Sequence, residues 1–259
     1  MVIGSCLIRR RVEPAFLIGL AFLFLAARAG ADDHITKNDG TVITGRIVGV
    51  TGNQVFVEAR SATGSVNKIP YYLADLKSVT MAPPANASKV MAPDVSPATV
   101  IATLEPEVKQ YAGLPVDWVV EAMAQLGDAY TAEGELSRAV AVYDQIAKSY
   151  SGTPYENVAK ACKAGLSLKA GMVDEALAAV QPIVDQANQE IAPSPSNGVI
   201  YAYAYMVYGQ ALEAQKKPRK ALEAYLTVKT MFYQNPILLA QANERAANLR
   251  EHNPGLSIE

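Results

Sequence analysis

The sequence contains few of the residue types that build active sites and metal centres. Its 259 residues include two cysteines, two histidines and one tryptophan. His34 and His252 lie near the two ends of the chain, and neither forms a recognisable nucleophile motif with Cys162 or with a serine. There is no glycine-rich phosphate-binding loop and no paired-cysteine or His-x-x-x-His spacing. The sequence therefore predicts no enzyme, no cofactor and no metal, unless folding brings two distant carboxylates together.

The N-terminus has the order of a secretory signal peptide. Three arginines at 9–11 precede a 13-residue apolar run from Ala15 to Ala27, and two overlapping Ala-x-Ala sites follow. The run is shorter than the roughly 20 residues that a helix needs to cross a bilayer. We therefore expect residues 1–31 to be a signal peptide, cleaved after Ala29 or Ala31, that exports the protein to a bacterial periplasm with no integral membrane span left. The alternative is an uncleaved segment that tethers the protein to the membrane.

Cleavage would leave one cysteine and a modest excess of acidic residues. It would remove Cys6 and leave Cys162 alone, so no intramolecular disulfide could form in the oxidising compartment. It would also leave 19 basic and 24 acidic residues, a formal charge of −5. Such a chain has no general attraction for nucleic acid or for anionic lipid. Half of the residues are apolar, which is enough for a packed core.

Residues 32–81 alternate between apolar and polar side chains with a period of two. Runs rich in Val and Ile, separated by Gly, Asn and Ser turns, predict four or five short antiparallel strands. We expect them to close into a small β-barrel domain, because closure leaves no open edge. The segments 39–47 and 69–76 resemble those of SH3-like and Sm-like barrels. Sm-like barrels often bind RNA, but few basic residues and the predicted export favour an adaptor barrel that packs or self-associates.

Residues 82–98 contain four prolines among small residues. They predict a semi-extended linker, because proline is excluded from helix interiors and central strands. Beyond this linker, at 99–259, the hydrophobic period becomes helical, which predicts an all-α region.

Two segments of this helical region share one pattern of spacing. The shared positions are Gly127, Ala139, Tyr143 and Pro154 in the first segment and Gly209, Ala221, Tyr225 and Pro236 in the second. In both, the glycine precedes the alanine by 12 residues, and the tyrosine and proline follow the alanine by 4 and 15. We expect the small residues to let two paired helices approach closely, the tyrosines to fill the space towards the next pair, and the prolines to stop the second helix.

This arrangement resembles the tetratricopeptide repeat (TPR), in which Leu-Gly and an aromatic residue mark the first helix, and alanine, an aromatic residue and a proline mark the second. No tryptophan stands at the first position, and the prolines come about three residues late. A degenerate middle unit has Lys163–Ala164 where Leu-Gly is expected, and Pro182 should kink or shorten its second helix. The resemblance is to exported bacterial envelope proteins of this family. It implies a helical solenoid, ended by a capping helix at 238–250 and preceded by a further helix near 100–111.

The resemblance also implies a binding groove, lined by the first helix of each pair. Carried over by alignment, the groove positions are Glu121, Ala124, Asp128 and Thr131 in the first unit and Tyr203, Met206, Gln210 and Glu213 in the third. Tyr201, Tyr205 and Tyr208 share one helical face and are expected in the core, whereas Tyr203 points elsewhere and is the aromatic candidate for ligand contact. Three acidic residues and no basic residue among the eight predict a ligand with some positive charge.

Two functional hypotheses follow. The first is a non-enzymatic exported scaffold that gathers proteins or peptides at the cell envelope through its solenoid groove. The alternative is a structural envelope protein that mainly self-associates, with the β-barrel as the contact of a homo-oligomer. The two differ in whether the protein alone changes its oligomeric state with concentration.

Overall fold

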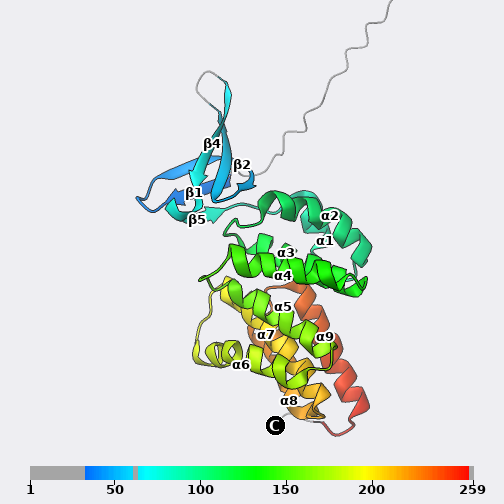
Figure 1. Ribbon diagram of the computed structural model, residues 1–259. Helices are drawn as coiled ribbons and strands as arrows, with labels where there is room; N and C mark the ends of the chain where they lie inside the picture. The colour runs from blue at the N-terminus through cyan, green and yellow to red at the C-terminus, as the bar shows by residue number, and fades with distance from the viewer. Residues whose placement is uncertain (1–32, 61–63, 257–259) are drawn as a thin grey trace, which may run out of the picture. The chain divides into compact units, whose positions relative to one another are not determined.

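The computed structural model describes residues 33–60 and 64–256 (Figure 1). The predicted signal peptide and Cys6 lie outside the described residues. The described chain begins with a five-stranded antiparallel sheet and continues as a mostly helical region. The predicted order, a small β region followed by a mostly α region, is confirmed.

The sheet is built from short strands joined by tight turns. Its elements are β1 (Asp33–Lys37), β2 (Val42–Thr51), β3 (Gln54–Arg60), β4 (Val66–Tyr72), the 3₁₀ turn η1 (Leu73–Asp75) and β5 (Leu76–Thr80). The alternating pattern buries one face, where Ile35, Ile47, Val55 and Val57 form the core. The strand order is β4-β3-β2-β1-β5, so β4 and β5 stand at the two ends of the sheet. No ladder joins β4 to β5 among the described strands, and η1 leads from one end strand to the other. The expected small barrel therefore stays a prediction.

A bulge in β2 lies against the first long helix. The register between β2 and β3 shifts between Ile47 and Gly49, where Gly49 has a φ of +143°. A Cβ at position 49 would lie 3.0 Å from the carbonyl oxygen of Gln110, and Gln110 Nε2 donates a hydrogen bond of 2.9 Å to the Val48 carbonyl. Glycine is required here because its backbone conformation and the close approach both disfavour a side chain.

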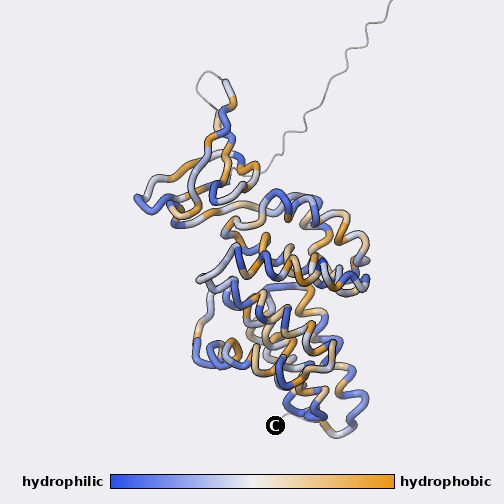
Figure 2. Tube along the Cα trace, in the orientation of Figure 1, coloured by the Kyte–Doolittle hydropathy of each residue, from blue (hydrophilic) through white to orange (hydrophobic). Residues whose placement is uncertain are grey.

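The helical region consists mainly of antiparallel hairpins in chain order. The helices are α1 (Ala85–Val90), α2 (Pro97–Tyr111), α3 (Asp117–Ala132), α4 (Leu136–Ser149), α5 (Glu156–Lys169), α6 (Val173–Gln189), α7 (Pro195–Ala214), α8 (Pro218–Met231) and α9 (Pro236–His252). Three hairpins, α3–α4, α5–α6 and α7–α8, follow one another, and each first helix also contacts the next one, α3 with α5, α5 with α7 and α7 with α9. Hydrophobic and hydrophilic residues alternate along most of these helices (Figure 2), which lets one side of each helix pack inward.

The prolines act differently from the expectation in several places. The segment expected to be a semi-extended linker contains α1, whose Ala87 and Val90 are buried. Pro182 lies inside α6 without shortening it, since that helix runs for 17 residues. Pro236 is the first residue of α9 rather than the end of α8, which stops at Met231. Proline fits the first turn of a helix because the missing N–H would have no partner within the helix there.

The three hairpins share one turn geometry. The residue after each first helix's C-cap has a positive φ: +79° at Gly134, +82° at Gly171 and +58° at Lys216. In each hairpin the amide of the following residue donates back to the carbonyl five positions earlier, Glu135 to Tyr130 (2.8 Å), Met172 to Ser167 (2.9 Å) and Lys217 to Leu212 (2.9 Å). This is the Schellman arrangement that ends a helix on a left-handed residue. The middle hairpin, degenerate in sequence, therefore turns in the same way as the other two.

The repeated glycines make room for the repeated tyrosines of their own hairpin. A Cβ at position 127 would lie 2.6 Å from Cζ of Tyr143 and closer still to its Cε1, and a Cβ at 209 would lie 2.6 Å from Cε1 of Tyr225. Each ring lies across the glycine of its partner helix, a contact that the expected filling of the space towards the next pair did not include. At the corresponding positions of the middle hairpin stand Ala164 and Val180, both buried. Where the first helix carries alanine instead of glycine, the second helix therefore carries valine instead of the larger tyrosine.

Candidate functional site

The predicted groove positions on α3 differ widely in exposure. Ala124 and Thr131 are buried, and Thr131 Oγ1 donates to the Gly127 carbonyl at 2.8 Å. Glu121 is half-buried and Asp128 is exposed. Surrounding protein atoms nevertheless raise the pKa of Asp128, chiefly through desolvation, and its Oδ1 accepts a hydrogen bond of 2.7 Å from the Tyr143 hydroxyl. Of these four residues, Asp128 offers the most surface to a partner.

The predicted positions on α7 offer less surface than expected. Met206 is buried, and Tyr203 is only 7% exposed, so its predicted role as an exposed aromatic anchor is corrected. Tyr201 and Tyr205 are buried as predicted, while Tyr208 is half-buried. The reason is the position of α7, which contacts α5, α6, α8 and α9, so that nearly its whole circumference is apolar and covered.

Gln210 and Glu213 keep partial exposure at the C-terminal half of α7. Glu213 Oε1 accepts a hydrogen bond from the Tyr225 hydroxyl and lies 3.5 Å from Arg245 Nη1. The tyrosine of the third hairpin thus bonds a carboxylate of α7, as Tyr143 of the first bonds Asp128 of α3. Each of these two acids therefore accepts a hydrogen bond from the second helix of its own hairpin.

The structure brings together polar residues that the sequence reading did not single out. They belong to the starts of α3, α5, α7 and α9, and we call them, with Glu121, the helix-start cluster: Asp117, Glu121, Tyr155, Ser196 and Asn235. Asp117 accepts hydrogen bonds from the Tyr155 hydroxyl (2.6 Å) and the Ser196 hydroxyl (2.9 Å). Asn235 Nδ2 donates to Glu121 Oε2 at 2.7 Å. The successive spacings of 38, 41 and 39 residues from Asp117 to Asn235 are a signal that could have identified them.

The surroundings of Glu121 disfavour the ionised form of its carboxyl group. Burial raises the pKa of Glu121 to about 7, and the charge of Asp117 acts in the same direction, while the hydrogen bond from Asn235 opposes both. A cavity of about 10 Å³ beside it is lined in part by Asp117, Tyr155 and Ser196. That volume is about the size of a single water molecule.

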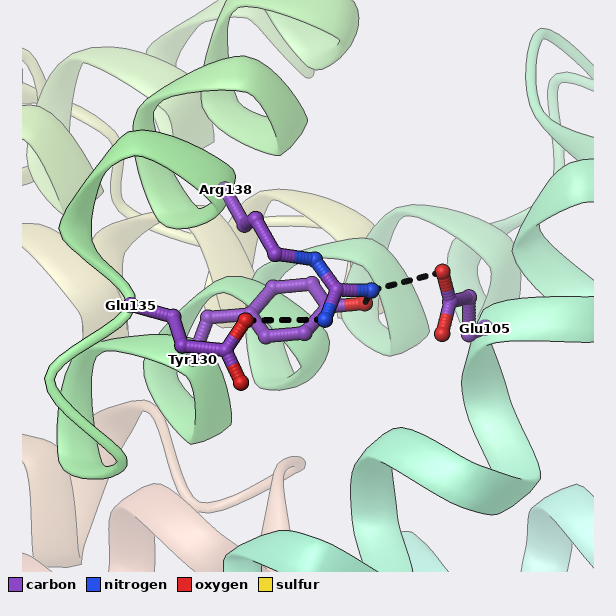
Figure 3. Close-up of polar contacts among 4 residues, drawn as sticks. All are labelled: Glu105, Tyr130, Glu135 and Arg138. Carbon is purple, nitrogen blue, oxygen red and sulfur yellow. Dashed lines mark hydrogen bonds and ion pairs between the residues drawn. The ribbon is translucent and has the colours of Figure 1, made fainter.

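A second polar group braces the first hairpin against α2 (Figure 3). The guanidinium of Arg138 lies over the Tyr130 ring, 4.0 Å from the ring centroid, and donates to the Tyr130 hydroxyl at 2.6 Å. It also pairs with Glu105 of α2 (2.7 Å) and with Glu135 in the turn (2.8 Å). Through these contacts Arg138 joins α2, α3 and the turn before α4, and its ion pairs are exposed to solvent.

The described residues contain neither a cluster of metal-ligating side chains nor a membrane-spanning helix. Among residues 33–60 and 64–256, no group of three or more His, Cys, Asp and Glu side chains is placed to hold a metal ion. In the same part of the chain, no helix has the length and apolar character needed to span a membrane. The thiol of Cys162 is buried, and burial raises its pKa well above the ordinary value.

Comparisons with known proteins return no similar protein: no family model, no curated protein and no solved structure matches the chain.

Proposed function

We propose that the protein is a non-enzymatic, exported scaffold of the cell envelope, and that its helical region is a tetratricopeptide-like stack that binds other proteins. The observation that carries the proposal is the threefold repetition of one helix–turn–helix geometry. Each hairpin has its left-handed turn residue seven positions after the glycine or alanine of the first helix, at Gly134, Gly171 and Lys216. A protein that repeats one hairpin in series builds an extended surface from equivalent positions, which suits contact with a partner protein.

The exposed surface of the proposed groove is formed by α3 and by the end of α7. Asp128 is exposed and Gln210 is half-buried, and they occupy comparable places on the first helices of the outer hairpins. With Tyr203 and Met206 buried, contact there is polar rather than anchored by an aromatic residue. The proposed partner is therefore a protein segment with polar and some basic side chains.

Cross-linking in cells, followed by quantification of captured envelope proteins, tests the scaffold role. The variants Asp128→Lys and Gln210→Lys should each reduce capture of the proteins that the unchanged chain captures. Glu223→Lys is the matched control, because Glu223 is exposed on α8, the second helix of its hairpin. Equal capture by all variants, with their helical circular dichroism unchanged, would contradict the proposed surface.

A second candidate function, self-association through the sheet, is favoured by the exposure of β4. This end strand exposes Val66, Ile69 and Tyr72, and an end strand leaves one row of backbone groups unpaired. Pro70 lies within β4; because it has no N–H, it weakens any strand added beside it. Light scattering across a hundredfold range of protein concentration distinguishes the two: growth in mass that Ile69→Lys abolishes supports self-association, and a constant monomer excludes it.

A further inference from the structure

We propose that Asp128 and the hydroxyl group of Tyr203 form a recognition site for one lysine side chain of a partner protein. The site rests on the scaffold function proposed above and specifies the chemical group that the partner presents. Tyr203 is only 7% exposed, yet its hydroxyl forms no hydrogen bond with any residue of 33–60 or 64–256. Buried tyrosine hydroxyls usually have a partner, and the buried Tyr201 and Tyr205 of the same helix both donate hydrogen bonds.

The unused hydroxyl of Tyr203 can still be reached from solvent. Within the part of the chain that the structure describes, the fully buried side-chain polar atoms without a partner are Trp118 Nε1 and Gln125 Oε1. The Tyr203 hydroxyl is not among them, so the small exposed fraction of this residue includes its oxygen. A polar group that is largely desolvated, unpartnered and still accessible is available to a ligand.

Tyr203 and Asp128 face the same space among three helices. The cavity at the helix starts is lined by residues of α3, α5 and α7, among them Glu121, Val158 and Val199. Tyr203 follows Val199 by four residues and Asp128 follows Glu121 by seven, so each lies on the face of its helix that lines the cavity. Consistent with this placement, the charges of Glu121 and Asp128 both act on the Tyr203 hydroxyl.

Asp128 supplies the charge of the site. It is exposed, yet surrounding protein desolvates its carboxyl group, as expected of a recessed group rather than a protruding one. Its Oδ1 accepts a hydrogen bond of 2.7 Å from the Tyr143 hydroxyl, and its other carboxylate oxygen has no hydrogen-bond partner among the described residues. Lys169 of α5 acts on it through its charge alone. One oxygen of Asp128 is therefore left for a donor.

A primary ammonium group matches these two acceptors. It is compact, carries a full charge and donates up to three hydrogen bonds, so it suits both a carboxylate oxygen and the oxygen of a tyrosine hydroxyl. The planar guanidinium of arginine is wider and fits less well, because so little of Tyr203 is exposed. A lysine carries its ammonium group on a thin stem of four methylene groups, which can lie along apolar surface.

Titration of the full chain with a lysine peptide tests the site. The probe is acetyl-Gly-Lys-Gly-amide, followed by NMR of isotope-labelled tyrosine rings at Tyr203 and at Tyr143. We expect saturable shifts with this probe and none with the norleucine peptide, which has a similar stem without the charge. Asp128→Asn should weaken binding about tenfold and Tyr203→Phe about fivefold. Tyr205→Phe is the matched control on α7 and should bind like the unchanged protein.

The unpartnered state of the hydroxyl has a separate test in the free protein. Tyr203→Phe removes a hydroxyl that bonds nothing, so it should not lower the free energy of unfolding. Tyr205→Phe removes the donor to Asn188 Oδ1 at 2.7 Å and should lower it. An equal loss of stability in the two variants, measured by urea unfolding, would overturn the assignment of an available hydroxyl at Tyr203.

Lysine recognition is refuted if the norleucine or arginine peptide binds as tightly as the lysine peptide, or if Asp128→Asn or Tyr203→Phe leaves the affinity unchanged. If that happens while Asp128→Lys still reduces capture of envelope proteins, the scaffold function stands and only the lysine site is lost. If the lysine peptide binds as expected while Asp128→Lys leaves capture unchanged, the site stands and the proposed scaffold surface is contradicted.

Discussion

The contact between Gly127 and Tyr143 leads to a prediction that runs against ordinary helix propensity. Replacing a helical glycine with alanine usually stabilises a helix by up to about 1 kcal/mol. At position 127, however, the new Cβ would lie 2.6 Å from Cζ of Tyr143, so the ring must move. Overpacking of this kind costs about 1–3 kcal/mol, and the displaced hydroxyl also loses its hydrogen bond to Asp128, worth about 1 kcal/mol. We expect Gly127→Ala to lower the free energy of unfolding by about 2 kcal/mol.

Gly165 provides a control within the same region. It is also a helical glycine, but a Cβ there would lie 3.6 Å from Cγ2 of Val207, an ordinary contact. Gly165→Ala should therefore raise the free energy of unfolding by roughly 0.5–1 kcal/mol. Urea unfolding followed by circular dichroism at constant pH measures both changes.

Removal of the ring tests the cause. In a Tyr143→Leu background, the obstacle to a Cβ at position 127 is gone, so Gly127→Ala should become neutral or stabilising. The reasoning is refuted if Gly127→Ala stabilises the protein with Tyr143 present, or if its destabilising effect is unchanged once the ring has been removed. Gly209→Ala, where the Cβ would meet Tyr225, should repeat the effect in the third hairpin.

Three further predictions concern charge, turn geometry and the buried thiol. Burial raises the pKa of Glu121 to about 7, so its contribution to the free energy of unfolding is complete below pH 4.5 and is lost as pH rises through 7. Urea unfolding should show that, between pH 5.5 and 8.5, the unchanged protein loses about 2 kcal/mol of this free energy relative to Glu121→Gln. Lys216 has a φ of +58°, a conformation that costs a residue with a Cβ about 1 kcal/mol, so Lys216→Gly should stabilise the protein by about that amount. Lys217 has a φ of −111°, so Lys217→Gly should not stabilise it. Equal effects of the two substitutions on the free energy of unfolding would contradict the assignment of strain to Lys216. The buried Cys162 thiol should react with a disulfide reagent at pH 8 only after urea is added, tested in a Cys6→Ser chain, and prompt reaction in the folded state would exclude this burial.

The sequence predicted the elements of the fold well where periodicity is strong. Alternation over 42–50 and 54–59 predicted strands, and the helical period beyond residue 99 predicted helices, because the side chains that must be buried repeat with the geometry of the element. It failed for residues 82–98, where α1 forms in spite of flanking prolines. Proline is disfavoured in a helix interior, but α1 itself contains no proline. Burial of Ala87 and Val90 stabilises this short helix.

The candidate binding site was predicted less well, for a physical reason. Positions carried over by alignment describe which side of a helix faces a groove, but not how many neighbours cover it. Tyr203 is on the expected helix, yet α7 is surrounded by four others and the ring is buried. The sequence did not predict the helix-start cluster, because its residues come from the starts of four helices that only the folded chain brings together.

The sequence by itself determined the order of a β region and a helical region, the spacing of the hairpins, and the small residues that they need. These follow from local period and from steric limits that act within about twenty residues. Tertiary structure alone decided that each repeated tyrosine covers its own glycine, that the sheet ends at β4 and β5, and that Glu121 meets Asn235. Such contacts join residues distant in the chain, and their energies depend on burial, which no local pattern of residues contains.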